Sequence, residues 1–241
     1  MEGESEKQTK CTLPNLGIRR DFFQNYYSAH GRSFPWREAS ASPFGILVAE
    51  ILLKQTYAGK VANVWPSLIA RYPSAGEMAA ADPDELLKSV SELGFGNQRT
   101  SALLALSSAI RHTEEPLSVD PGDLIKLPYV GVYTAHAVAC FAYGQRFPIV
   151  DLSIVRTISR VVGIRPPKDI RRATEVWNIA WSLLPWRRFK EHNYGLLDFA
   201  AAVCKPRSPS CIECPIAAKC AHGRHVTINV SESQHRRVDR L

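Results

Sequence analysis

The sequence LIKLPYVGVYTA at residues 124–135 predicts two helices joined by a tight turn. A short helix is expected to end at Leu127, a Val130-Gly131 turn follows, and a second helix begins near Thr134. Gly131 permits a positive φ and a close backbone approach, and the N–H groups at a helix start can hold a phosphate. The segment therefore predicts a helical hairpin, which is either an ordinary packing unit or a phosphate-binding one.

The rest of the chain reads as helices separated by short Pro and Gly segments. Apolar residues follow the helical period of about 3.6, as at Leu86, Leu87, Val90 and Leu93. The expected helices cover residues 17–30, 43–57, 60–71, 83–91, 97–113, 120–127, 133–143, 152–162, 170–184 and 190–203. No convincing strand is present, because Pro148 interrupts the short apolar run at 147–150. The sequence therefore predicts an all-α fold.

The composition describes a basic protein that can form a core. Its 241 residues include 30 Lys and Arg against 23 Asp and Glu, a formal net charge of +7, and 45% are hydrophobic. This share excludes wholesale disorder, and no apolar run approaches the ~18–20 residues that span a bilayer. The N-terminus is polar and lacks the apolar region of a secretory signal. We therefore expect an intracellular protein of the cytoplasm or nucleoid that contacts no membrane, and the positive charge suits nucleic acid.

Four of the six cysteines cluster near the C-terminus with the spacing C-x6-C-x2-C-x5-C: Cys204, Cys211, Cys214 and Cys220. In a reducing compartment such a cluster is more often a metal site than a set of disulfides. Four thiolates can enclose either a tetrahedral zinc ion or a [4Fe–4S] cluster. Lys205 and Arg207 place positive charge on the same loop, where a phosphate could be bound.

Two acidic residues stand out from apolar surroundings. Asp151, in the sequence FPIVDLSIVRTISRVVG at 147–163, is either the N-cap of the next helix or a functional carboxylate. Glu50 is the only charged residue between Phe44 and Leu53. It either pairs with Lys54 on a surface stripe or is a buried carboxylate, which is costly unless it is paired or functional.

These segments together resemble the helix-hairpin-helix DNA glycosylases of the endonuclease III and MutY type. The resemblance covers about residues 18–220. The hairpin of that superfamily usually reads L-P-G-V-G-x-x-T-A, and this chain departs from it at Tyr129, which replaces the first Gly. The patterns FPWR, AEILLKQTYAG, ELGFGNQR and HNYGLLDFAAAVC look most like the thymine/uracil–guanine mismatch glycosylases.

The resemblance implies a two-lobed all-α enzyme with one [4Fe–4S] cluster on the four cysteines. One lobe combines residues 18–39 with 149–220 and carries the cluster, and the other covers 40–148 and carries the hairpin. A polar tail at 1–17 and a basic tail at 221–241 flank them. The implied partner is double-stranded DNA with a mismatched or damaged base, which lies across the cleft of a monomeric protein.

The resemblance also implies catalytic roles for four residues. Asp151 stabilises the positively charged sugar in the transition state, and Glu50 assists base departure or orients water. Ser153 stands where the family carries Asn or His, so it is a shorter substitute. Tyr133 occupies the position of the lysine that forms a Schiff base in bifunctional members, which predicts a monofunctional glycosylase that uses water.

The implied DNA contacts come from several loops. Lys54 and Gln55 fill the space left by the flipped nucleotide, and Phe95 is the apolar wedge, although a core Phe is the alternative. The remaining expected contacts are Asn97, Gln98, Arg99, Val130, Gly131, Thr134, Arg156, Lys205 and Arg207.

We rank removal of T or U opposite G first. The second candidate is an adenine glycosylase acting opposite G or 8-oxoguanine, although such enzymes usually carry a further C-terminal domain and only residues 221–241 follow Cys220 here. The third is a protein that binds DNA lesions without catalysis, and a zinc-binding protein is a further alternative.

Overall fold

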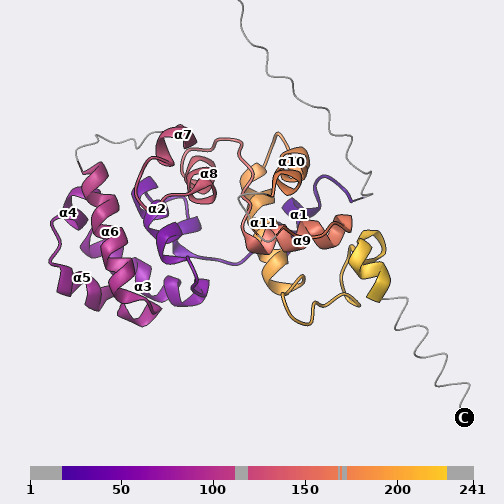
Figure 1. Ribbon diagram of the computed structural model, residues 1–241, viewed down its shortest axis with the longest axis horizontal. Helices are drawn as coiled ribbons and strands as arrows, with labels where there is room; N and C mark the ends of the chain where they lie inside the picture. The colour runs from indigo at the N-terminus through magenta and orange to yellow at the C-terminus, as the bar shows by residue number, and fades with distance from the viewer. Residues whose placement is uncertain (1–17, 112–118, 168, 170–172, 227–241) are drawn as a thin grey trace, which may run out of the picture. The chain divides into compact units, whose positions relative to one another are not determined.

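The computed structural model describes residues 18–111, 119–167, 169 and 173–226, and these residues form helices and connecting loops without a strand (Figure 1). This confirms the predicted all-α fold. The elements are α1 (Phe22–His30), η1 (Pro35–Arg37), α2 (Pro43–Leu52), α3 (Ala58–Arg71), α4 (Ala75–Ala79), α5 (Pro83–Val90), η2 (Ser91–Leu93), α6 (Gly96–Ile110), α7 (Pro121–Leu124), α8 (Val132–Phe141), α9 (Leu152–Val162), α10 (Thr174–Leu183), α11 (Phe189–Ala202) and η4 (Ala217–Lys219).

Several boundaries differ from those predicted. Helix α2 ends at Leu52 rather than at residue 57, because the following segment turns through Gln55, which has a φ of 56°. Residues 221–226 are helical, so the C-terminal segment does not begin as an extended tail. The predicted tail 1–17 and the ends of two predicted helices, at residues 112–113 and 170–172, lie outside the described residues.

The chain divides into two compact units. Unit 1 combines residues 1–29, 150–187 and 191–241, and unit 2 combines 30–149 with 188–190. The borders between the two lobes predicted from the sequence were placed between residues 39 and 40 and between residues 148 and 149. Of the described elements, α2 to α8 belong to unit 2, and α1, α9, α10 and most of α11 belong to unit 1. Among the described residues, no helix is long and apolar enough to cross a membrane.

Helix α2 is the central element of unit 2. Ser42 caps its N-terminus by accepting the Gly45 N–H, and nearly every residue of the helix is buried. Its sequence PFGILVAEIL is apolar on all sides, as expected for a helix surrounded by core. Gly45 allows Trp65 of α3 to approach, since a Cβ there would lie 2.9 Å from the indole, and Trp65 Nε1 donates to Gly45 O at 2.8 Å. The only charged side chain of this helix, Glu50, is therefore held within the core.

The predicted hairpin is formed by α7 and α8. Asp120 caps α7, and the Val130 N–H donates to Leu127 O at 3.2 Å to close the turn. Gly131 was the residue that could accept a positive φ, but it is extended (φ −106°, ψ 178°), and Tyr129 has the positive φ of 62°. Pro128 and Tyr129 thus occupy the second and third turn positions, and the third position of type II turns needs a positive φ.

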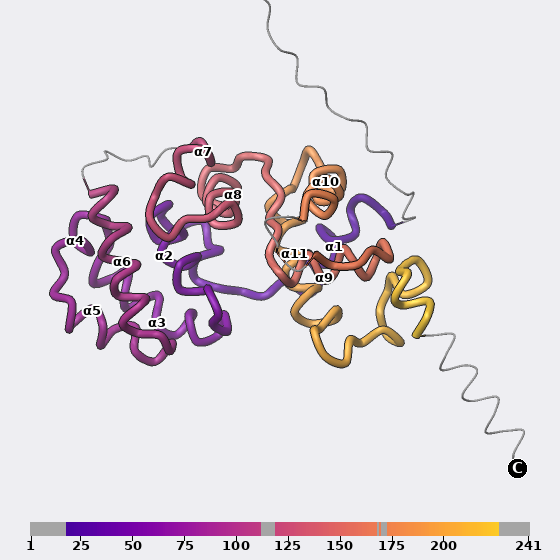
Figure 2. The backbone as a smooth tube through the Cα atoms, viewed as in Figure 1, coloured from indigo at the N-terminus to yellow at the C-terminus, as the bar shows by residue number. Residues whose placement is uncertain are grey.

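Unit 1 is held together by close packing of α1 against α11. At Gly195 a Cβ would lie 1.9 Å from Phe23 O, so only glycine fits at this crossing. The rings of Phe22, Phe23 and Tyr26 pack edge-on around Phe199 at centroid distances of 5.3–5.7 Å. This packing fixes the end of α11, from which the cysteine-rich loop continues (Figure 2).

Candidate functional site

Asp151 caps the N-terminus of α9 in unit 1. Its Oδ1 accepts the Ile154 N–H at 2.8 Å and the Ser153 hydroxyl at 2.7 Å. Among the described residues, no hydrogen bond reaches Oδ2. The side chain is half-buried and lies at the N-terminus of α9, the positive end of the helix dipole. Asp151 is therefore the N-cap of α9, a role that is compatible with a functional carboxylate because Oδ2 remains available to a ligand.

Glu50 lies in α2 and is 4% exposed. This burial contradicts the alternative in which Glu50 and Lys54 form a pair on a surface stripe. Partial burial lowers the pKa of Lys54, and the opposing effect of the Glu50 charge raises it. Glu50 is thus a carboxylate in an apolar helix with one lysine near enough to interact with it.

The predicted site residues of the hairpin differ in how deeply they are buried. Tyr133 is half-buried in the first turn of α8, and its phenol provides no amine. Val130 and Thr134 are 7% and 2% exposed, so their side chains belong to the core, whereas Gly131 is exposed. A contact between this turn and a phosphate would therefore involve backbone N–H groups.

A pocket of about 300 Å³ opens on the surface of unit 2, where the segment after α2 meets the start of α6 and the hairpin turn. Its lining residues are Ile51, Lys54, Gln55, Phe95, Gln98, Arg99, Ala102 and Tyr129. The structure thus brings together five of the expected DNA-contact residues with Tyr129, which the sequence did not select. Phe95 is 58% exposed, so it is not the core residue of the alternative interpretation.

Backbone strain is concentrated at this pocket. Gln55, Phe95 and Tyr129 have φ values of 56°, 55° and 62°. Only two other non-glycine residues of the described chain have a positive φ. Because left-handed residues cost free energy and persist mostly where they serve binding or catalysis, the clustering marks the pocket as a candidate ligand site.

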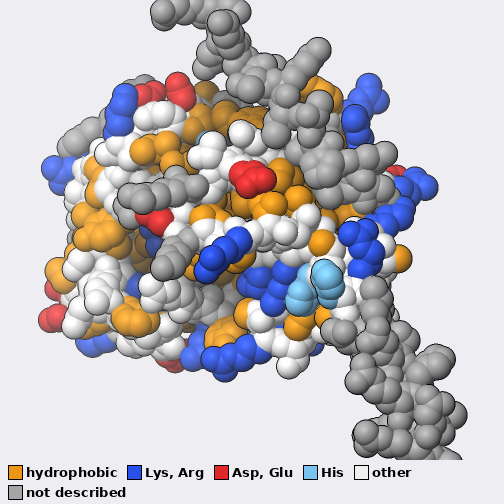
Figure 3. Space-filling model, turned by 45° about the vertical axis from the view of Figure 1, so that its right-hand side comes forward, with side chains coloured by type: hydrophobic (Ala, Val, Ile, Leu, Met, Phe, Trp, Pro, Cys, Tyr) orange, Lys and Arg blue, Asp and Glu red, His pale blue; other side chains and the backbone are white. Residues whose placement is uncertain are grey.

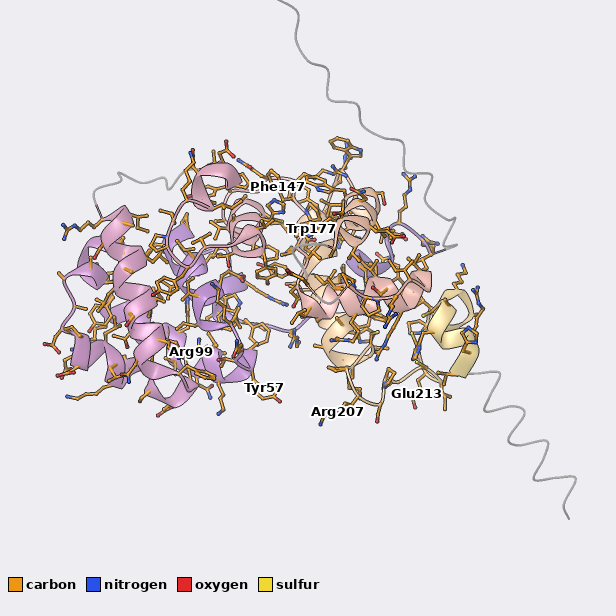
Figure 4. The ribbon with its side chains drawn as sticks, viewed as in Figure 1. Tyr57, Arg99, Phe147, Trp177, Arg207 and Glu213 are labelled. Atoms are coloured by element: carbon orange, nitrogen blue, oxygen red, sulfur yellow. The ribbon has the colours of Figure 1, made fainter. Side chains whose placement is uncertain are left out.

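Arg99 forms the floor of the pocket. It is 5% exposed, and its guanidinium donates to Gly94 O (2.8 Å), Leu52 O (2.8 Å), Lys54 O (2.9 Å) and the Thr56 hydroxyl. Burial lowers its pKa from the ordinary value. Its donors thus satisfy carbonyls at and just after the C-terminus of α2, where the chain leaves the helix. Figure 4 shows Arg99 inside unit 2, whereas Tyr57 projects outward.

Two arginines of α9 fasten the cysteine-rich loop. Arg156 donates from Nε to Cys204 O and from Nη2 to Ala200 O, each at 3.0 Å. Arg160, one turn later, donates to Lys205 O at 2.7 Å and lies 3.5 Å from Cys204 Sγ. Arg156, which was expected to contact DNA, thus donates hydrogen bonds to backbone carbonyls within the protein. Arg160 was not selected from the sequence, although its spacing of four from Arg156 places both on one helix face.

The four clustered cysteines line one pocket, together with Phe199, Ile216 and Gly223. All four are free thiols, so no disulfide connects them. Burial raises the pKa of Cys211 and of Cys214, and the neighbouring thiols raise both further. Four adjacent thiolates are therefore unfavourable by themselves, and a cationic centre would stabilise them.

The donor set fits a polynuclear centre. In the part of the chain that the structure describes, no three His, Cys, Asp or Glu side chains converge on one point where a single metal ion would sit. In a four-iron cluster each thiolate binds a different iron atom, so the sulfurs stand further apart than around one zinc ion. Lys205, Arg207 and Lys219 are exposed around the loop, and Figure 4 shows Arg207 projecting from it.

An all-α protein with a helix-hairpin-helix turn, an aspartate after it and a four-cysteine loop has the features of a DNA repair glycosylase. The chain belongs to the HhH-GPD superfamily of base excision DNA repair proteins, whose pattern matches residues 48–179. It is therefore a DNA glycosylase of base excision repair.

Individual relatives support this membership. A thymine/uracil-DNA glycosylase of Pyrobaculum aerophilum is 37% identical over 203 residues, which cover 82% of this chain and 88% of the relative. An adenine DNA glycosylase of Mycobacterium tuberculosis is 34% identical over 79% of this chain and 63% of the relative. The solved structure of a thermostable thymine-DNA glycosylase superposes with a TM-score of 0.80 and 29% identity, covering 87% of this chain and 97% of that chain.

Proposed function

We propose that this glycosylase hydrolyses the N-glycosidic bond of T or U opposite G and leaves an abasic site. The observation that carries the reaction is the Asp151 carboxylate, which is fixed through Oδ1 while no described residue bonds to Oδ2. The relatives named thymine/uracil-DNA and thymine-DNA glycosylase support the choice of base.

Asp151 acts electrostatically in this mechanism. As the base departs, positive charge develops on C1′ and the ring oxygen of the sugar. An ionised carboxylate held rigidly beside that charge stabilises the transition state, as in glycoside hydrolysis. Ser153 acts through Asp151 by donating its hydroxyl proton to Oδ1, so we assign it as a positioning residue rather than as a group that touches the sugar.

Glu50 is proposed to orient the attacking water or to assist departure of the base. A carboxyl group that is 4% exposed in an apolar helix has the kind of environment that tunes carboxyl groups for acid–base work near neutral pH. Tyr133 cannot form an imine with the sugar, because a phenol has no amine. We therefore propose that the enzyme has no lysine-dependent lyase activity at this position.

Unit 2 would hold the distorted DNA at the pocket described above. Gln55 would occupy the space of the flipped nucleotide, and Phe95 would wedge beside the opposite base, which offsets part of the cost of unstacking. Lys205 and Arg207 on the cysteine-rich loop would bind backbone phosphates. The right-hand part of the surface in Figure 3 carries prominent Lys and Arg side chains and few acidic ones.

We propose that Cys204, Cys211, Cys214 and Cys220 hold one [4Fe–4S] cluster. The shared pocket of the four cysteines supports a metal centre, and the lack of a single-ion geometry among the described residues favours a cluster over zinc. The cluster would supply a rigid core for the loop. Arg156 and Arg160 hold the start of that loop against α9, and thereby fix its exposed basic residues.

A base-release assay tests the proposed function. Duplexes with T·G, U·G, A·G, A·8-oxoguanine and fully paired sites are incubated with the enzyme, and strand breaks are measured with and without alkali. We expect release from T·G and U·G, with breaks only after alkali. Reaction of the adenine duplexes alone would support the second candidate, which the Mycobacterium tuberculosis relative favours, and breaks without alkali would contradict the Tyr133 argument.

An Asp151→Asn variant separates catalysis from binding. Asn is also a good N-cap, so α9 should remain folded while the charge that stabilises the sugar is lost. We expect base release to disappear while binding to T·G duplexes persists. Unchanged activity would remove Asp151 from the mechanism. A wild-type protein that binds mismatches without releasing any base would instead support the lesion-binding candidate.

A further inference from the structure

Tyr129 is a residue of the hairpin turn to which the proposed mechanism gives no role. It stands where the hairpins it resembles carry glycine, and it adopts the left-handed conformation that favours glycine. Its side chain is 53% exposed. A strained backbone with an exposed ring is unfavourable for folding, so a stabilising role within the unit does not explain the residue.

The ring lines the same pocket as Phe95 and Gln55. All three residues have a positive φ, and they come from three segments far apart in the sequence. The Lys54 ammonium donates to the Tyr129 carbonyl, which ties the hairpin turn to the segment after α2. Lys54 therefore acts as a positioning residue that holds the turn, and with it the ring, at the pocket.

The pocket suits a flat, polar-edged ligand. Two exposed aromatic rings provide stacking surfaces, and the amides of Gln55 and Gln98 provide donors and acceptors. Glu50 is absent from its lining residues, so the pocket lacks this candidate catalytic carboxylate. A nucleobase that is unpaired but not undergoing chemistry has the matching properties.

We propose that Tyr129 stacks on the base that remains in the helix opposite the excised nucleotide and increases affinity for the opened site. This inference rests on the proposed function, because it assumes that a nucleotide is flipped out beside Gln55. It adds a second aromatic contact to the Phe95 wedge, supplied by the hairpin turn. The contribution of Tyr129 to the binding free energy comes from stacking rather than from charge, so this contribution should not depend on the salt concentration.

The test measures binding and needs no catalysis. Wild type, Tyr129→Gly and Tyr129→Phe are titrated with a duplex that carries an uncleavable abasic analogue at the excision site and guanine opposite. We expect Tyr129→Gly to weaken binding by about 5-fold or more, the lower end of base–aromatic stacking. Tyr129→Phe should bind like wild type, and the slope of affinity against salt should be the same for all three.

A second duplex locates the contact. It carries an abasic analogue on both strands, so the opposite base is removed. The difference between wild type and Tyr129→Gly should then vanish, because the two changes remove the same contact. A difference that persists on this duplex would overturn the proposal, since Tyr129 would be contacting the flipped nucleotide or the backbone instead.

The melting temperature excludes a merely structural effect. Glycine suits the left-handed position, so Tyr129→Gly should melt at or above the wild-type temperature while binding more weakly. Ile125→Ala is the matched control, because it removes an exposed apolar side chain of the hairpin that does not line the pocket. A lower melting temperature for Tyr129→Gly, or equal weakening by Ile125→Ala, would overturn the proposal. Absence of base release from T·G and U·G in wild type would overturn the proposed function alone, because this binding test uses uncleavable DNA.

Discussion

The Ser153 hydroxyl donates a 2.7 Å hydrogen bond to Oδ1 of Asp151. The second bond to the same oxygen comes from the Ile154 N–H at 2.8 Å. Two donors anchor the carboxylate at Oδ1, while no described residue donates a hydrogen bond to Oδ2. The proposed role of Ser153 is therefore to orient the aspartate from within its own helix turn.

Removing this hydroxyl should slow base release. In Ser153→Ala the backbone donor remains but the carboxylate can rotate, so stabilisation of the sugar charge is reduced. A hydrogen bond to a charged group contributes about 1.5–3 kcal/mol, and we expect a fall of about 10-fold in the single-turnover rate. Single-turnover base release from U·G duplexes measures this directly.

Ser153→Thr is the control, since it keeps the hydroxyl and should retain most of the rate. Affinity for DNA should be the same in both variants, because neither changes a proposed DNA contact. A Ser153→Ala enzyme with the full rate would show that the backbone N–H alone orients Asp151.

The hairpin and the aspartate could be predicted because their signals are local. Proline in a turn and an aspartate before an amphipathic helix are signals that depend on neighbouring residues alone. The left-handed position could not be assigned this way. Gly131 was the only glycine of the turn, yet the closing bond from Val130 to Leu127 places the positive φ at Tyr129.

The position of Arg99 could not be predicted from the sequence either. An arginine in the polar segment GNQR reads as exposed, and its partners Leu52 and Lys54 lie 47 and 45 residues away. Only the packing of α6 against α2 decides that the guanidinium is buried. Glu50 was easier to single out from the sequence, because a helix that is apolar on all sides leaves no exposed face for an isolated charge.

Arg99→Met should destabilise unit 2. The variant leaves the carbonyls of Leu52 and Lys54 without the donors that now satisfy them, and buried unsatisfied groups are costly. We expect a loss of about 3 kcal/mol in the free energy of unfolding, measured by urea denaturation. The segment carrying Gln55 should also lose its conformation, so mismatch binding should weaken at temperatures where the variant is folded.

Arg71→Met provides the comparison. Arg71 pairs with Glu85 at 3.0 Å on the surface, where ion pairs contribute little. The denaturation midpoint of Arg71→Met should therefore match that of the wild type. Equal stability of the Arg99 and Arg71 variants would contradict the assigned role of Arg99.

The proposed cluster predicts a defined metal content. Native protein purified without oxygen should contain about four iron atoms per chain, no stoichiometric zinc and the broad visible absorption of an iron–sulfur cluster. Cys214→Ser should lose iron and absorption together, and its binding to DNA should weaken because the basic loop is no longer held. Elemental analysis and absorption spectra measure both quantities.

Cys140→Ser should keep the full iron content, since Cys140 is buried in α8 of unit 2 and is not part of the loop. A native, zinc-loaded and iron-free preparation would contradict the cluster and favour a zinc site on the same cysteines.

His192 should make the stability of the protein depend on pH. It is 3% exposed in α11, packs edge-on against Phe23, and burial lowers its pKa from 6.5 to about 4. Between pH 6.5 and 4 the unfolded chain therefore binds a proton at His192 that the folded chain does not bind. Stability rises with pH through this window and falls as the pH drops through it, by up to about 3 kcal/mol in total.

Replacing His192 by Leu, which is apolar and of comparable size, removes the titration. The free energy of unfolding of His192→Leu should then change less steeply than that of wild type over this window, by up to about 1.4 kcal/mol per pH unit, when urea denaturation is followed at each pH. Parallel curves for the two proteins would mean that the buried imidazole is protonated in the folded state.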